Sequence, residues 1–194
     1  MNRAILIQGP SNNVSELKKV WDGYDIIWST WVGEESKFDE NDKVIFSPTP
    51  DSSGVGNIAL QYKTTFEGLK FIKDLGYDRV LKWRSDMVPT SPNELLELFQ
   101  HKCLNFLYWV DLNGGYIVDY MLEGDIDLAL ECWDINTFSA NYSERITTDN
   151  ILSIDNISLN FIGHQLTLSN DIYWIKRDVN ISSYNNIKGF KNKI

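Results

Sequence analysis

The chain has 194 residues, of which 43% are apolar and 13% aromatic, with seven Trp. We expect residues 1–194 to form a single domain, because this length and composition suit one substantial core. The net charge of −9 argues against nonspecific binding to nucleic acid or to an anionic membrane.

Targeting signals are not evident in the sequence. Before the turn at Gln8, only Ala4–Ile7 is apolar, and no apolar run approaches the length that spans a bilayer. We therefore expect neither a signal peptide nor a transmembrane segment. Cys103 and Cys132 lack the spacing of metal ligands and read as thiols in a reducing compartment. These features predict a cytoplasmic location.

The first quarter of the chain alternates between strand and helix patterns. Residues 4–7 form an apolar run typical of a central strand, which ends in the tight turn Gln8-Gly9-Pro10-Ser11. A helical spacing of apolar residues follows from Val14 to Trp21. Two further strands are predicted at 24–31 and 44–46. This order indicates layered α/β structure.

Residues 47–56 form a loop rich in Pro and Gly that contains Asp51. The next segment, 57–75, has one apolar stripe and ends at Gly76, which predicts a long helix. Asn57 and Gln61 lie one turn apart near its start. They either face solvent or face the same cleft as the end of the following strand.

The segment from Asp78 to Asp86 is a short apolar strand that changes abruptly into Arg84-Ser85-Asp86. Pro89 blocks its continuation, and Ser91 with Pro92 predicts the start of a helix that runs to Gln100. Asp86 therefore belongs at the carboxyl end of a strand, where ligands bind in open α/β sheets. A carboxylate there suits a divalent cation with a phosphorylated ligand. The alternative is an Asp in a surface turn, paired with Arg84.

The second half gives weaker patterns. We expect strands at 104–110 and at 116–122, the latter holding Asp119, and a helix at 126–133 opened by Gly124-Asp125. Residues 138–150 are polar with aromatic anchors, and 151–162 is ambiguous between helix and strand. A late strand is predicted at 171–178. Together the elements predict a three-layer α/β/α sandwich with a mostly parallel central sheet.

Several common catalytic motifs are missing from the sequence. It has no P-loop, no Gly-x-Gly-x-x-Gly after the first strand and no Gly-x-Ser-x-Gly elbow. His101 and His164 show no zinc-ligand pattern and read as structural or surface residues. Carboxylates at strand ends and a loop of small residues remain as the chemical signals.

These signals occur in an order that resembles a known family. Asp51-Ser-Ser-Gly54, then Asn57 and Gln61, then Thr65, Gly68 and Leu69, then Val80–Asp86 resemble the WavE-type glycosyltransferases of lipopolysaccharide synthesis. The chain is also similar to chlorella-virus glycosyltransferases with a small GT-A core. Asp119–Gly124, with the acidic helix after it, resembles that family's strand-to-helix segment. Arg84-Ser85-Asp86 stands where a GT-A enzyme carries Asp-x-Asp, with Arg84 in place of the first Asp.

The resemblance implies a GT-A-like enzyme of polysaccharide biosynthesis that moves a sugar from a nucleotide-sugar donor, with UDP as the expected nucleotide, to a saccharide acceptor. Asp86 would bind Mn²⁺ or Mg²⁺, which stabilises the departing diphosphate. If the transfer inverts the anomeric configuration, the general base would be Asp119, then Glu144, then Asp178 in order of preference. The implied nucleotide site comprises Gln8, Gly9, Pro10, Asp51, Asn57, Gln61, Lys82, Arg84 and Ser85.

Two other functional classes stay open from the sequence. The chain could be a non-catalytic module that binds a nucleotide sugar, because it is short and has a single motif Asp. It could also be a nucleotide-processing phosphotransferase, although the missing P-loop weighs against that class.

Overall fold

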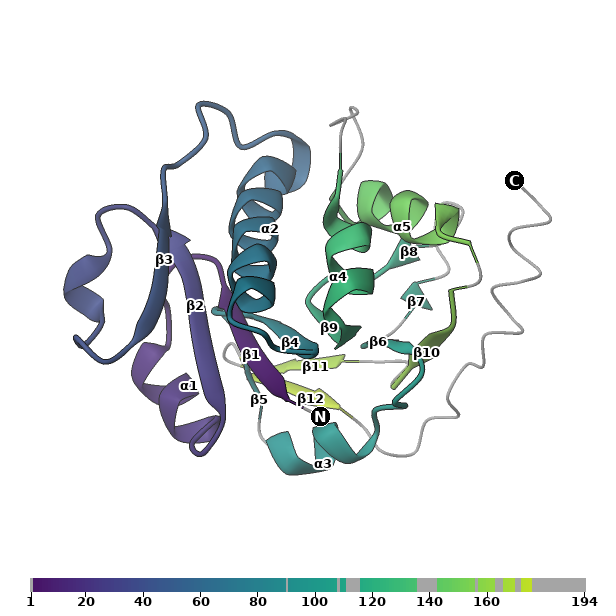
Figure 1. Ribbon diagram of the computed structural model, residues 1–194, viewed down its shortest axis with the longest axis horizontal. Helices are drawn as coiled ribbons and strands as arrows, with labels where there is room; N and C mark the ends of the chain where they lie inside the picture. The colour runs from purple at the N-terminus through teal and green to yellow at the C-terminus, as the bar shows by residue number, and fades with distance from the viewer. Residues whose placement is uncertain are drawn as a thin grey trace.

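A seven-stranded sheet forms the centre of the molecule, which a computed structural model describes for residues 2–89, 91–107, 109–110, 116–135, 143–155, 157–162, 166–169 and 172–175 (Figure 1). Its strands are β1 (Arg3–Gln8), β2 (Asp25–Trp31), β3 (Lys43–Ser47), β4 (Arg79–Arg84), β6 (Leu104–Phe106), β9 (Met121–Asp125) and β10 (Leu159–Phe161). They lie in the order β10-β6-β9-β4-β1-β2-β3.

The sheet is mixed but mostly parallel. Four neighbouring pairs are parallel, namely β10 with β6, β4 with β1, β1 with β2, and β2 with β3. Strand β9 is antiparallel to both of its neighbours, β4 and β6. The prediction of an α/β fold with a mostly parallel central sheet is confirmed.

Helices cover both faces of this sheet. Side chains of β1 alternate between two apolar cores: Leu6 packs with α2, α4 and α5 on one face, and Ile7 packs with α1 and α3 on the other. Figure 1 shows these two groups of helices on opposite sides of the central strands. The predicted three layers are therefore present. The helices are α1 (Val14–Val20), α2 (Ile58–Asp74), α3 (Pro92–Glu97), α4 (Ile126–Trp133) and α5 (Ser143–Ser153).

Shorter elements surround these layers. The 3₁₀ turn η1 (Glu35–Lys37) follows β2, and the 3₁₀ turn η2 (Val55–Asn57) precedes α2. A three-stranded sheet contains β5 (Val88–Pro89), β11 (Leu166–Ser169) and β12 (Ile172–Ile175), and β12 lies inside the predicted late strand. A two-stranded sheet pairs β7 (Trp109–Val110) with β8 (Tyr116–Ile117).

The predicted continuous strands at 104–110 and 116–122 are wrong. Each one starts in one sheet and ends in another: β6 and β9 belong to the central sheet, whereas β7 and β8 form a separate two-stranded sheet. The chain turns at Asp119 and Tyr120 to make this change. Asp119 therefore lies in a turn and not in a strand. The ambiguous segment contains both the end of α5 and strand β10.

A buried ionic network fixes the amino end of β4 against β9 and β6. The Glu123 carboxylate, with no exposed surface, accepts hydrogen bonds from Arg79 Nε at 2.9 Å and Nη2 at 2.8 Å. Asn105 Nδ2 donates to the same carboxylate at 2.6 Å, and Arg3 Nη2 lies 3.0 Å from it. Breaking a buried charge pair is costly, so this network opposes any slip in strand register.

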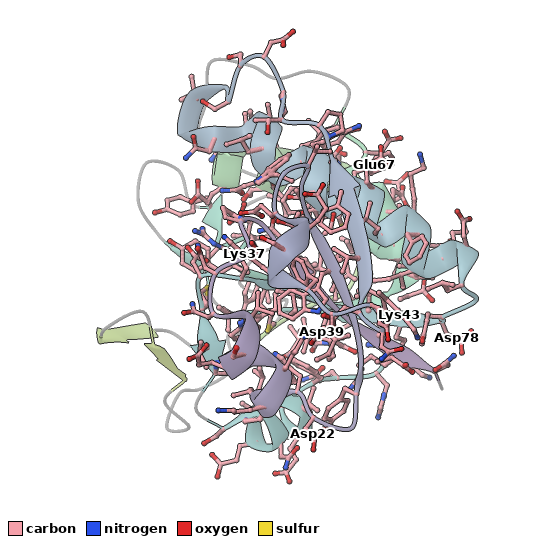
Figure 2. The ribbon with its side chains drawn as sticks, turned by 90° about the vertical axis from the view of Figure 1, so that its left-hand side faces the viewer. Asp22, Lys37, Asp39, Lys43, Glu67 and Asp78 are labelled. Carbon is pink, nitrogen blue, oxygen red and sulfur yellow. The ribbon has the colours of Figure 1, made fainter. Side chains whose placement is uncertain are left out.

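The outer surface carries most of the charge. Figure 2 labels charged side chains such as Asp22, Lys37 and Lys43, all of them exposed. In the part of the chain that the structure describes, no helix combines the length and apolar character needed to cross a bilayer.

Helix α2 approaches the sheet closely at Gly68. A Cβ atom built on Gly68 would lie 2.5 Å from Leu6 Cδ1 and 3.2 Å from Ser29 Cβ. An exposed helical Gly→Ala change normally stabilises a helix by up to about 1 kcal/mol. At Gly68 the added methyl group would instead overlap the buried Leu6 side chain, so Leu6 or α2 must shift.

We predict that Gly68→Ala lowers the free energy of unfolding by about 1–3 kcal/mol, the usual cost of overpacking a core. Urea denaturation followed by circular dichroism measures this change. Glu67→Ala is the matched control, because among the described residues its half-buried side chain forms ion pairs with Lys63 and Lys70 of the same helix, at i,i+4 and i,i+3 spacing. A Gly68→Ala variant as stable as the wild type would contradict the described packing.

Candidate functional site

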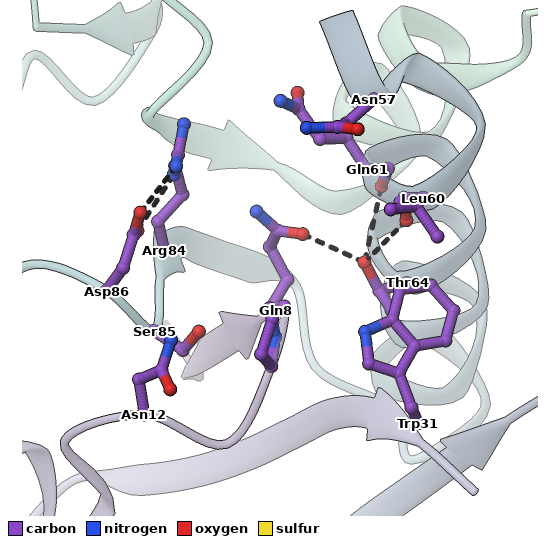
Figure 3. A pocket seen from close by; sticks show the side chains of 12 residues that line it. Gln8, Asn12, Trp31, Asn57, Leu60, Gln61, Thr64, Arg84, Ser85 and Asp86 are labelled. Atoms are coloured by element: carbon purple, nitrogen blue, oxygen red, sulfur yellow. Dashed lines mark hydrogen bonds and ion pairs between the residues drawn. The ribbon is translucent and has the colours of Figure 1, made fainter. Parts of the chain in front are cut away.

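A pocket of about 190 Å³ lies where β1 and β4 end, beside the first turns of α2 (Figure 3). The chain order explains why it forms there. From β1 the chain moves outward to β2 and β3, and then α2 carries it back to β4 on the other side of β1. This reversal of strand order leaves a crevice outside the carboxyl ends of the two strands. The lining residues are Gln8, Gly9, Pro10, Asn12, Trp31, Asn57, Leu60, Gln61, Thr64, Arg84, Ser85 and Asp86.

The two strand ends meet at Gly9 and Ser85. The Ser85 amide donates to the Gln8 carbonyl at 3.0 Å, and the Gly9 amide donates to the Ser29 carbonyl at 3.1 Å. Gly9 has φ of +112°, and a Cβ atom there would lie 3.0 Å from Ser85 Oγ. The positive φ favours glycine at position 9, and a Cβ atom there would also press on the Ser85 hydroxyl.

Carboxamide side chains line much of the pocket. Gln8 is almost fully buried, and its Oε1 accepts a hydrogen bond from Thr64 Oγ1 at 2.8 Å. The amide nitrogen of Gln8 then points away from Thr64 and into the pocket (Figure 3). Gln61 Oε1 is buried without a hydrogen-bond partner among the described residues. Such groups suit a polar, uncharged ligand surface, such as a nucleobase or a sugar ring.

Arg84 and Asp86 form the charged side of the pocket. Asp86 accepts two hydrogen bonds from the Arg84 guanidinium, from Nε at 2.9 Å and from Nη2 at 2.5 Å. The guanidinium also lies over the Tyr120 ring, 4.8 Å from its centroid. Burial alone would lower the pKa of Arg84, but the pair with Asp86 raises it above its ordinary value. The pairing that the sequence left open as an alternative is therefore present.

The guanidinium keeps donors for a ligand. An arginine has five N–H groups, and the pair with Asp86 uses the Nε–H and one N–H of Nη2. The remaining terminal nitrogen points away from Asp86 (Figure 3). This fork of N–H donors matches the oxygen geometry of a phosphate.

The described residues do not form a complete metal site. Within the described ranges, no group of three or more His, Cys, Asp or Glu side chains could hold an ion. Asp86 is the one carboxylate that lines the pocket, and it is engaged with Arg84. Mg²⁺ is often held by one or two carboxylates together with substrate phosphates. Asp86 fits that lesser role, for an ion that arrives with the donor, so Mn²⁺ or Mg²⁺ stays a prediction.

Lys82 and Asp119 lie behind the pocket and do not line it. The Lys82 ammonium is fully buried, donates to the main-chain oxygen of Asp119 and lies 5.0 Å from the centroid of the Trp133 ring. Burial lowers the pKa of Lys82 to about 8. Burial also raises the pKa of Asp119, whose carboxylate oxygens have no hydrogen-bond partner among the described residues.

The remaining predicted site residues are dispersed. Asp51 is exposed in the loop before η2 and does not line the pocket. Glu144 is half-buried in the first turn of α5, and its negative charge contributes to the raised pKa of Asp119. Asp178 lies outside the described residues. The structure thus brings together Gln8, Gly9, Pro10, Asn57, Gln61, Arg84, Ser85 and Asp86 in one pocket.

Four lining residues were not predicted: Asn12, Trp31, Leu60 and Thr64. Trp31 carried a usable signal, because it ends a parallel strand and ligands bind at such ends. Thr64 follows Gln61 by three residues on α2 and could have been placed on the same helix face. Its bond to Gln8 could not be foreseen, because it joins residues 56 positions apart.

Comparison with known proteins adds no assignment: no protein-family model and no curated protein matches this chain.

The lowered pKa of Lys82 makes stability depend on pH. In the folded protein the Lys82 ammonium has a pKa of about 8, whereas in the unfolded chain it has the ordinary value of 10.5. Between these values the unfolded state binds more protons, so Lys82 makes the free energy of unfolding rise with pH in that window.

We therefore predict that the stability of the wild type, measured relative to Lys82→Met, increases from pH 8 towards pH 10.5. Thermal melts of both proteins across this range provide the measurement. Other lysines titrate in both proteins, so the difference isolates Lys82. A difference independent of pH would show that Lys82 has an ordinary pKa.

Proposed function

We propose that this chain is a glycosyltransferase that takes a sugar from a nucleotide-sugar donor, with UDP as the nucleotide, and transfers it to a saccharide acceptor. The observation that carries the proposal is the pocket at the β1–β4 crevice, which combines an oriented arginine with a carboxamide-lined interior. A GT-A type of fold and membership of a WavE-like family are part of this proposal. They rest on the resemblance of Val80–Asp86 and the preceding segments to that family.

The two parts of the pocket suit the two parts of the donor. Gln8, Asn57 and Gln61 offer amide donors and acceptors for the nucleoside, whereas Arg84 offers its fork to the diphosphate. Sites that enclose a whole ligand usually measure about 300–1,000 Å³. A pocket of about 190 Å³ therefore holds one portion of the donor, such as the nucleoside, with the rest near Arg84 and Asp86.

The chemistry follows from where charge develops. Cleavage of the bond between the sugar carbon and the diphosphate oxygen leaves negative charge on that oxygen. A guanidinium already oriented by Asp86 and Tyr120 stabilises this charge without reorganising. The acceptor hydroxyl forms the new bond to the sugar and gives its proton to a carboxylate. Asp119 is buried and does not line the pocket, so Glu144, half-buried on α5, is the first candidate for this base among the described residues.

A cytoplasmic location belongs to the same proposal. Both cysteines of the chain are unpaired, with Cys132 buried and Cys103 half-buried. Unpaired thiols are typical of a reducing compartment, in which nucleotide sugars would be the available donors.

Donor hydrolysis tests the proposal. We predict that the protein binds UDP-sugars and slowly releases UDP from one of them without an acceptor. Arg84→Met should reduce this release by about a hundredfold, the usual loss for one oriented donor at a developing charge. Asp22→Asn, an exposed substitution after α1, is the control and should not change it. Binding without hydrolysis or transfer would instead identify a non-catalytic binding module, and no nucleotide binding would refute both.

Metal dependence has its own test at Asp86. Asp86→Asn keeps the size of the side chain and removes the charge that attracts a hard cation. The measured quantity is the ratio of UDP affinity with Mn²⁺ to UDP affinity without it. We predict that this ratio is at least about tenfold smaller in Asp86→Asn than in the wild type, a loss of roughly 1.4 kcal/mol in binding free energy. Calorimetry with Mn²⁺ or with a chelator gives this ratio, with Asp22→Asn as the matched control. An unchanged ratio would exclude Asp86 as a ligand.

A further inference from the structure

Lys82 is a buried charge without a role in the chemistry described so far. Its ammonium has no exposed surface, and its described contacts are the Asp119 main-chain oxygen and the Trp133 ring. Burying an ammonium is costly, and the nearby charge of Asp119, the main-chain oxygen and the aromatic face compensate for that cost only in part. The charge therefore calls for a functional explanation.

The contact of Lys82 is with the turn that supports Arg84. Asp119 and Tyr120 form the turn between β8 and β9, and Lys82 holds it at the Asp119 oxygen. The next residue, Tyr120, places its ring against the Arg84 guanidinium at 4.8 Å. Asp86 holds the edge of the same guanidinium through two hydrogen bonds. Arg84 is thus fixed on its face by Tyr120 and on its edge by Asp86.

Strand geometry makes this arrangement compact. Lys82 and Arg84 are two residues apart on β4, so their side chains leave the same face of the sheet. Lys82 extends into the layer beneath α4, whereas Arg84 reaches the pocket at the end of the strand. One strand therefore supplies both the ligand-binding cation and the anchor for the turn that supports it.

We infer that Lys82 is a positioning residue: its ammonium anchors the Asp119–Tyr120 turn and so holds Arg84 in the orientation that binds the donor diphosphate. The inference rests on the proposed function for the identity of the ligand, but the positioning itself does not. The charged groups that act on Lys82 are Asp119, Arg84, Asp86 and Glu144. Because Lys82 lies behind Arg84, its own contact with the ligand is not required.

Side-chain NMR tests the positioning without any ligand. In the wild type the Arg84 Nε–H donates a hydrogen bond to Asp86. The resonance of this group is identified by its disappearance from the spectrum of the Arg84→Lys variant. We expect Lys82→Met to speed hydrogen exchange of this group by about tenfold, because a released turn makes the pair open more often. Tyr120→Leu should have the same effect. Unchanged exchange in Lys82→Met would overturn the inference. If Lys82→Met does not fold, Lys82→Leu, which also lacks a donor for the Asp119 oxygen, serves the same comparison.

UDP binding by calorimetry tests the consequence. Both Lys82→Met and Tyr120→Leu should weaken UDP binding by about three- to tenfold, the range expected when a cation loses its aromatic support. Tyr120→Phe, which keeps the ring, should bind like the wild type. The double variant Lys82→Met/Tyr120→Leu should be no weaker than either single variant, since both act through one contact. Additive losses, or equal losses in Tyr120→Phe and Tyr120→Leu, would overturn the inference. A wild type that binds no UDP would refute the proposed function alone, because the exchange measurement still decides the positioning.

Discussion

The hydrogen bond from the Ser85 amide to the Gln8 carbonyl, at 3.0 Å, holds the ends of β1 and β4 together, and the pocket depends on it. This bond extends the parallel pairing of the two strands one residue beyond Gln8 and Arg84. Gly9 makes the approach possible, since any side chain at that position would meet Ser85. Helix α2 then closes the third side through the bond from Thr64 to Gln8. These contacts therefore set the distance between the carboxamide side chains and the Arg84–Asp86 pair across the pocket.

Charge is distributed unevenly around strand β4. The chain is acidic overall, with a net charge of −9, yet β4 carries Arg79, Lys82 and Arg84. Arg79 is used at the amino end for the buried pair with Glu123, and Arg84 is used at the pocket. An acidic protein repels a diphosphate at long range, so binding depends on oriented cations at short range. The fixed orientation of Arg84 offsets the partial neutralisation that its pair with Asp86 causes.

Local patterns predicted the strand ends and the start of α2 well, because each is marked by an apolar run that stops at Gly, Pro or a charged residue. Local patterns predicted the structure less well where pairing between distant segments of the chain determines it. Lys82 was expected to contact the ligand, but its position two residues before Arg84 places it about 6.6 Å further from the strand end. There it lies beneath Trp133. Asp119 was expected in a regular strand, but the change of pairing partner from β7 to β4 and β6 imposes a turn at that point.

The alternation of β4 also constrains how this gene can change in length. Val80 faces the core under α2 and α4, whereas Leu81 and Trp83 face the core under α1 and α3. Deleting a single codon within 79–84 would exchange these faces, burying the wrong side chains and turning Arg84 away from the pocket. The exposed segment 51–55 has no such register to keep. Insertions and deletions that selection tolerates should therefore accumulate before α2 and be purged from β4.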